Sequence, residues 1–496
     1  MKNILLLSLF LLLLCLVEAG AQTTVSVDTY TKGGTNNDFK DYFSSGTQNE
    51  NLIINLTKDI LFTNNNSIWN YYSGTKTING LKNDGGRYEL NGNNNAYGMT
   101  VSNIAQDRTK TLCINDINIR NMKANDGAIY LNNNNNNNNI LLSLYNISFI
   151  NNNRAINTNN NNGTNRSIII YSSGTINFSN NSIAGSNGGA MNLVDRTTTT
   201  FENSITTFSS NYSNYSGGAI YITGSNSALS FIDSIDVTFS GNQAKNSGGA
   251  IYANSGATVT FSGSSTTFSS NTATDDSGGA IYITGSNSTL NFTNSTMTFT
   301  SNSSKNGGGA IDFQNGAKSN WNNNSIINFN NNSTNNGGAI HILSNSSVTI
   351  TFSTTSFIGN QATRNGGAMD IWQNSAISWT NSYALFKNNN AVAEDNPSVG
   401  TGGGAIFFGS NSTVTFNNSK IDFIENNTEK NGGAIATQAS NSNTAILIFE
   451  GSTATFKGNI AASSGGAIYA EDYSSIDFEN SSTTFVSNYA GFSGGA

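Results

Sequence analysis

The sequence predicts an all-β protein, a right-handed parallel β-helix with about 30 residues and three strands in each coil. Three observations favour this solenoid. A Gly-Gly-Ala tripeptide recurs at a nearly constant step, a Phe-x-x-Asn motif keeps the same step, and short runs of alternating apolar and polar residues lie between them. A constant step of this length is typical of one structural unit that is stacked many times.

The Gly-Gly-Ala tripeptide sets the length of the coil. Its alanines are 29 to 33 residues apart, with one longer step of 37 residues before Ala405. Glycine suits a corner that requires positive φ or a close backbone approach, so we expect one such corner in every coil. Representative tripeptides are Gly217-Gly218-Ala219, Gly248-Gly249-Ala250 and Gly278-Gly279-Ala280.

The Phe-x-x-Asn motif stands about nine residues before each Gly-Gly. Examples are Phe239 with Asn242 and Phe268 with Asn271. We expect the phenylalanine to point into the core. An asparagine at the same corner of every coil can form a hydrogen-bonded amide ladder, as in other stacked β-structures.

A third feature is an aromatic residue at the end of a short alternating run, usually with an apolar residue two positions before it. Period-two alternation with β-branched and aromatic residues indicates strands. We expect each strand to pair with its equivalent one coil along, at about 4.8 Å. A β-sandwich is the main rival, but it would not repeat a unit of this length. The predicted inward aromatic residues are Phe231, Phe261, Phe292, Trp321, Phe352, Trp379, Phe416, Phe449 and Phe478.

Three regions follow from these patterns. Residues 1–21 read as a secretion signal, with Lys2, an apolar stretch and a small-residue cleavage site that ends at Ala21. Residues 22–125 lack the Gly-Gly-Ala step and are expected to form an N-terminal cap and irregular first coils. Residues 126–496 are expected to form the repeat β-helix, truncated at the C-terminus because the sequence stops inside a unit.

The composition argues against several classes of partner. Charged residues make up 10% of the chain and the net charge is −7, whereas a nucleic-acid-binding protein needs a basic stripe. No apolar segment of about 18 residues follows the leader, so no transmembrane helix is expected. Phosphate, zinc and calcium motifs are absent, so we expect no cofactor and no metal.

One column of residues, two positions after the Gly-Gly-Ala alanine, is expected to point outward. Asp312, His341 and Asp370 would stack on three successive coils, with the carboxylates about 9.6 Å apart. That separation is near the upper end for inverting glycoside hydrolysis, about 6.5–9.5 Å. A carbohydrate-cleaving or metal site is one interpretation; the favoured one is a surface ladder in which the histidine pairs with both carboxylates.

The same column begins with three tyrosines, Tyr221, Tyr252 and Tyr282. They could form a contact surface for a partner or for sugar rings. The favoured interpretation is that the rings stack on one another and stabilise the sheet. The six residues of this column are the candidate binding residues of the chain.

The repeated Gly-Gly-Ala-Ile and Phe-x-x-Asn motifs resemble the polymorphic outer-membrane protein family of bacterial autotransported adhesins. The resemblance covers about residues 126–496. It implies a secreted or cell-surface, adhesin-like β-helical passenger that attaches to a protein or glycan on host or neighbouring cells. Family members carry a C-terminal β-barrel, so we expect membrane anchoring only through a barrel that this sequence does not contain.

A carbohydrate-active β-helix enzyme, a polysaccharide hydrolase or lyase, is the alternative. Fold alone does not separate the two classes. An enzyme would need long loops that wall a cleft beside Asp312 and Asp370, and the only clear inserted loop is Ala391 to Thr401. We therefore expect a non-enzymatic protein located outside the cell or at the surface of the outer membrane.

Overall fold

The computed structural model describes residues 22–28, 39–44, 51–63, 67–69, 74–95, 98–102, 109–133, 139–160, 167–392, 402–439 and 443–496. The predicted secretion signal and most of the inserted loop lie outside these residues. The chain forms two compact units. The first comprises Met1–Asn214 with Gly218–Val237, and the second comprises Tyr215–Gly217 with Thr238–Ala496.

Both units are parallel β-solenoids, which confirms the predicted fold class. Their coils contain about 30 residues, and three sheets run through the coils. Strands pair in parallel with their equivalents one coil along, in the register that the sequence repeat predicts. Among the described residues, no helix is long and apolar enough to cross a membrane.

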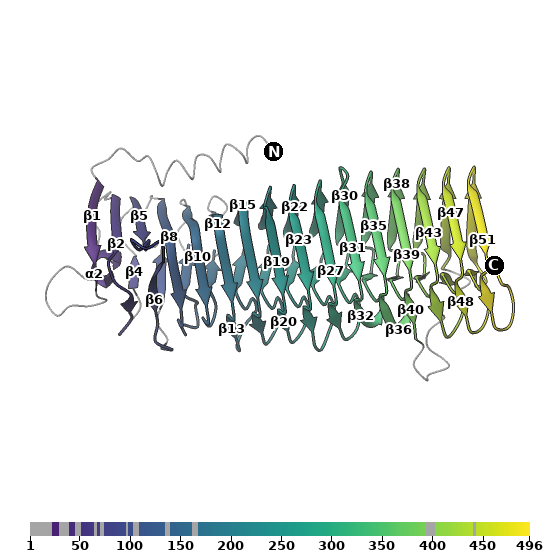
Figure 1. Ribbon diagram of the computed structural model, residues 1–496, viewed down its shortest axis with the longest axis horizontal. Coiled ribbons are helices and arrows are strands. Elements are labelled where there is room, and N and C mark those ends of the chain that lie inside the picture. Colours follow the sequence, from purple (N-terminus) through teal and green to yellow (C-terminus); the bar gives the residue numbers. More distant parts are fainter. Residues whose placement is uncertain are drawn as a thin grey trace. The chain divides into compact units, whose positions relative to one another are not determined.

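One coil of the second unit shows the plan. The three predicted strands are β21 (Ile251–Asn254), β22 (Thr258–Ser262) and β23 (Ser265–Ser269). A fourth strand of two residues, β24 (Thr272–Ala273), follows the asparagine corner and was not predicted. Figure 1 shows β22 and β23 and their equivalents in later coils repeating along the second unit. The next coil is built from β25 (Ile281–Thr284), β26 (Thr289–Thr293), β27 (Thr296–Thr300) and β28 (Ser303–Ser304).

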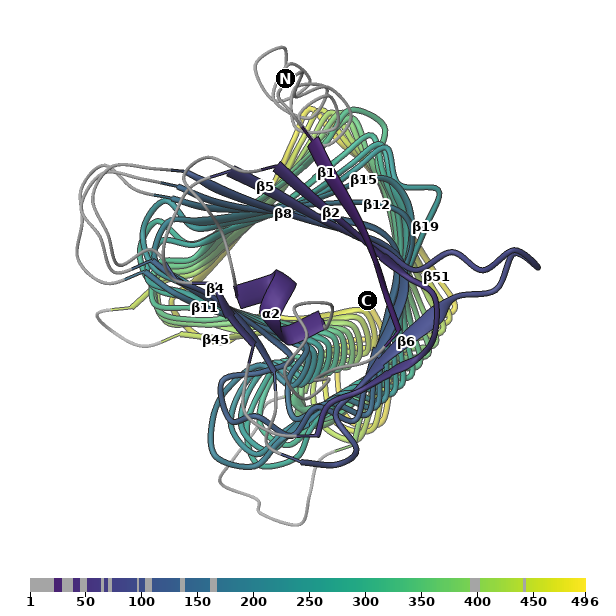
Figure 2. The same cartoon turned by 90° about the vertical axis from the view of Figure 1, so that its left-hand side faces the viewer.

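The first unit differs in having longer strands and a short helix. The helix α2 (Phe39–Ser44) buries Phe39 and Phe43, and Lys76 donates to the carbonyl oxygens of Tyr42 and Phe43. Figure 2 shows α2 within the outline traced by the strands of this unit. The helix was not predicted, because six residues are too few to show a helical period. The long strands are β8 (Lys110–Arg120), β10 (Ile140–Ile150), β12 (Ile168–Ser179) and β15 (Thr197–Ser209).

Columns of like residues fill the core of each unit. In the second unit the rings of the Phe-x-x-Asn phenylalanines stack nearly parallel, with centroids 4.6 Å apart from Phe239 to Phe268 and 4.9 Å apart from Phe268 to Phe299. All three are fully buried. The predicted inward column is therefore confirmed, and the ring spacing follows the spacing of the coils.

The asparagines form the predicted amide ladder. The Nδ2 atom of Asn302 donates to the carbonyl oxygen of Phe268 and to Oδ1 of Asn332, both at 3.0 Å. Its own Oδ1 accepts from the backbone and side-chain nitrogens of Asn271. Each side chain thus fills both its donor and acceptor capacity inside the core. Members not recognised in the sequence, although they keep the same spacing, are Asn389 in the second unit and Asn152 and Asn181 in the first.

The Gly-Gly corner is required by space and by conformation. Gly278 has φ of 69°, which favours glycine, and a Cβ atom on Gly279 would lie 2.0 Å from the carbonyl oxygen of Gly309. The backbones of successive coils approach so closely here that no side chain fits.

Phe352 departs from the predicted aromatic column. Ile350 takes the inward place between Trp321 and Trp379, while Phe352 lies at the next corner, 56% exposed and with φ of 48°. Positive φ is rare for a bulky residue. Taking the aromatic residue as the end of the alternating run placed the inward position two residues too late, at Phe352 instead of Ile350.

Candidate functional site

The candidate residues of the second unit lie on one sheet, in five successive coils. Tyr252 on β21 pairs with Tyr282 on β25, which pairs with Asp312 on β29 (Ile311–Gln314). His341 on β33 (Ile340–Ile342) and Asp370 on β37 (Met369–Ile371) continue the row. The structure therefore brings these five residues together in the predicted order. Tyr221 lies on β17 (Ile220–Thr223) of the first unit, where it is half-buried.

The expectation that this column faces solvent is wrong for its charged members. Asp312 is 0% exposed, Asp370 is 2% exposed and His341 is 8% exposed. The backbone before the Gly-Gly corner covers Asp312 and His341: a Cβ atom on Gly307 would lie 2.4 Å from Nδ1 of His341 and 2.8 Å from Oδ2 of Asp312. Strand alternation predicts an outward side chain, but it does not reveal that a neighbouring segment folds over that side chain.

The imidazole of His341 lies between the two carboxylates. Its Nδ1 atom is 2.9 Å from Oδ2 of Asp312, and its Nε2 atom is 4.0 Å from Oδ2 of Asp370. The side chain of Trp372 also donates a hydrogen bond to Asp370. This geometry matches the ladder interpretation, in which the histidine is held by a carboxylate from each neighbouring coil. We call Asp312, His341 and Asp370 the buried ionic cluster.

The environment of the buried ionic cluster shifts two pKa values upward. Burial lowers the pKa of His341, but the charge of Asp312, its hydrogen bond and the charge of Asp370 outweigh burial and raise it to about 9. Burial raises the pKa of Asp370 to about 7, against the opposing effects of His341 and Trp372. Both groups therefore hold their protons more tightly in the folded chain than in the unfolded chain.

The cluster is poorly arranged for hydrolysis. Inverting glycoside hydrolysis needs a water molecule and a sugar between the two carboxyl groups. Here the imidazole of His341 occupies the space between them, and the corner at Gly307 separates the cluster from solvent. In the described part of the chain, no group of three His, Cys, Asp or Glu side chains could hold a metal ion.

The two tyrosines of the second unit stack on each other. Their ring centroids are 5.2 Å apart and the ring planes differ by 9°. Tyr252 is half-buried, and Tyr282 is 8% exposed. Burial, and then the charge of Asp312, raises the pKa of Tyr282. This geometry supports stacking within the sheet and leaves little ring surface for a ligand at Tyr282.

A polar groove on another sheet of the same coils was not recognised in the sequence. Its volume is about 290 Å³, and three successive strands contribute to it: β28, β32 (Ser333–Asn336) and β36 (Gln361–Asn365). The sequence signal was weak, because these strands carry no repeated apolar residue that would mark their length. The residues that line this polar groove are Ser304, Lys305, Ser333, Thr334, Asn335, Gln361 and Thr363.

Comparison with known proteins identifies the repeat. Five segments match the model of the Chlamydia polymorphic membrane protein repeat, namely residues 205–223, 236–254, 265–284, 296–314 and 453–471. Each segment contains one Phe-x-x-Asn motif followed by one Gly-Gly-Ala-Ile, the two motifs that form the amide ladder and the glycine corner. The family resemblance seen in the sequence is thereby confirmed.

Similarity to other proteins is weak. No curated protein matches the chain. Among solved structures, the chain is similar to a PL6 family alginate lyase, with 8% identity and a TM-score of 0.19 over 96% of this chain and 98% of that chain. A likeness this weak carries no argument about function.

Proposed function

We propose that this chain is the surface-exposed passenger of an autotransporter and attaches to host or neighbouring cells, because it carries the repeats of the polymorphic outer-membrane protein family. The five matched repeats are the observation that supports this proposal most directly. Its partner would be a protein or a glycan on the other cell. The repeats account for the fold, and the outward side chains of the coils would provide the contacts.

The outer faces of the second unit suit adhesion through many weak polar contacts. In β22 and β23 the side chains that do not enter the core are hydroxyls, such as those of Thr258, Thr260 and Thr267. Few charges interrupt them, since only 10% of all residues are charged. A partner that engages several equivalent coils would gain affinity by effective concentration.

Binding of the labelled full chain to cultured epithelial cells and to bacterial cells tests attachment. We expect saturable binding that is lost when the chain is unfolded by heat before labelling. Binding no greater than that of an unrelated β-helix protein would refute the proposal. Protease treatment of intact cells that express the protein tests surface exposure, since a surface passenger should be cleaved while cytoplasmic proteins stay intact.

The carbohydrate-cleaving alternative makes a different prediction. Polysaccharide turnover that is lost in both Asp312→Asn and Asp370→Asn would establish it, provided that both variants keep the circular dichroism spectrum of the wild type. The burial of both carboxylates speaks against this alternative.

A further inference from the structure

The polar groove on β28, β32 and β36 differs from the same region of the other coils. In most coils this sheet contributes strands of two residues, such as β24 and β44 (Asn427–Thr428). At the groove it widens to four residues in β32 and five residues in β36. The wider strands lie side by side, with Ser333 in register with Gln361. The groove beside these strands spans three coils.

The groove offers both hydrogen-bond donors and acceptors. Within its wall the Thr363 hydroxyl donates to Oδ1 of Asn335 at 2.9 Å, and the Ser304 hydroxyl donates to Oγ1 of Thr334 at 2.9 Å. The first of these bonds uses one lone pair of the Asn335 amide oxygen and does not involve its two N–H groups. No carboxylate lines the groove.

One cation lines the groove, and a second is next in sequence to a lining residue. Lys305 is exposed and lines it, and Arg364 is exposed and directly follows the lining residue Thr363. The ion pairs of the described residues include neither of them. Two cations without a carboxylate partner, beside hydroxyl and amide donors, form an environment for an anion that carries several hydroxyl groups.

We propose that this groove binds an acidic glycan, through a sugar residue that carries a carboxylate or a sulfate. Its volume of about 290 Å³ is at the small end of ligand sites, so it would hold about one or two sugar rings rather than a long chain. Lys305 and Arg364 would pair with the acidic group. The hydroxyls of Ser333 and Thr334 and the amide of Asn335 would bind the sugar hydroxyls. The inference rests on the proposed attachment function and names the ligand class.

Equilibrium binding to the full chain tests the groove. The probes are sialyllactose for the carboxylate, a heparin disaccharide for the sulfate, and lactose as the neutral control. We expect at least one acidic probe to bind, lactose to bind more than tenfold more weakly, and the affinity to fall as salt is raised, because exposed charges are screened. Equal binding of lactose, or no binding of either acidic probe, would overturn the proposal.

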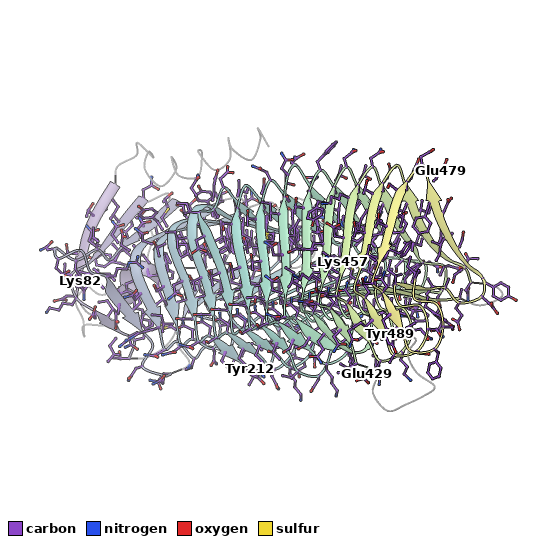
Figure 3. The ribbon with its side chains drawn as sticks, turned by 45° about the vertical axis from the view of Figure 1, so that its right-hand side comes forward. Lys82, Tyr212, Glu429, Lys457, Glu479 and Tyr489 are labelled. Carbon is purple, nitrogen blue, oxygen red and sulfur yellow. The ribbon has the colours of Figure 1, made fainter. Side chains whose placement is uncertain are left out.

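Three variants locate the site. Lys305→Gln with Arg364→Gln should weaken binding about tenfold, as expected for two exposed ion pairs. Asn335→Asp keeps the acceptor for Thr363 but adds a negative charge, and should weaken binding at least as much. The matched control is Lys457→Gln on β47 (Thr453–Lys457), an exposed lysine labelled in Figure 3, which should bind like the wild type. Unchanged affinity in the two groove variants, at unchanged melting temperature, would place the ligand elsewhere.

The same proteins separate this proposal from the attachment proposal. If the wild type attaches to cells but binds no acidic glycan, the groove proposal fails and the attachment proposal stands. If the chain binds an acidic probe through the groove but does not attach to cells, the attachment proposal fails and the groove proposal stands.

Discussion

The buried ionic cluster should make the second unit less stable as the pH rises. The pKa of His341 increases from an ordinary value of 6.5 to about 9 in the folded chain. A folded pKa above the unfolded value means that the stabilisation is fully present below pH 6.5 and is lost as the pH rises through about 9. The pKa of Asp370, raised from 3.8 to about 7, acts in the same direction over a lower range.

The magnitude follows from the histidine alone. One pKa unit corresponds to about 1.4 kcal/mol, so the difference between 6.5 and about 9 gives about 3 kcal/mol. The contribution of Asp370 overlaps with it, because the two groups interact across 4.0 Å. We therefore expect the unfolding free energy to fall by about 3 kcal/mol between pH 6 and pH 10 through this cluster.

A triple variant isolates the contribution of the cluster from that of all other titrating groups. This variant carries Asp312→Asn, His341→Gln and Asp370→Asn. The three substitutions keep the approximate shape of the side chains and remove every titrating group of the buried ionic cluster. Urea unfolding at several pH values can be followed by tryptophan fluorescence, since Trp321, Trp372 and Trp379 all lie in the second unit. The wild type should lose about 3 kcal/mol more than the triple variant over this pH range. Parallel pH profiles for the two proteins would refute the electrostatic account.

Three further substitutions, with Asn320→Ala as a control, test the repeat itself. Asn302→Ala removes four hydrogen bonds of the amide ladder and leaves their buried partners without a bond. It should therefore lower the unfolding free energy, measured in urea, by about 3–6 kcal/mol. Asn320→Ala, which changes an exposed side chain, should lower it by less than about 0.5 kcal/mol. Gly307→Ala should displace the His341 ring and flatten the pH profile described above, and an unchanged profile would contradict the close approach seen here. Phe352→Asn should raise the melting temperature, because asparagine tolerates positive φ and the phenylalanine is exposed; a lower melting temperature would show that the exposed ring makes a stabilising contact.

Much of the fold could be predicted because every coil has to meet the same packing and hydrogen-bonding requirements. A residue such as Asn302 must bond to its equivalents before and after it, so the sequence repeats wherever the structure does. The inward phenylalanines follow from the same logic. The short fourth strand and the helix α2 could not be predicted in this way, because they carry too few residues to show a period.

The sequence predicted the order of the candidate site residues along the coils, but it did not predict their burial. The repeat alone places Asp312, His341 and Asp370 on neighbouring coils, and the pairing confirms it. The burial of Asp312 and His341 depends on the path of the glycine corner, in particular on the missing side chain at Gly307. The position of a residue in the repeat predicts on which side of its own strand the side chain lies. It does not predict which other segments of the chain pack against that side chain.

The departures from the repeat gather in one part of the second unit. The family model matches up to residue 314 and again from 453. Between them lie His341 and Asp370 of the buried ionic cluster, the widened strands β32 and β36, and the strained, exposed Phe352. A solenoid coil is stabilised mainly by matching its neighbours, so each departure loses some of that matching. Strain and irregular geometry of this kind concentrate where a protein functions. This reasoning places the search for a discrete ligand site first at the polar groove, which begins in the matched repeat 296–314 and extends into the irregular coils.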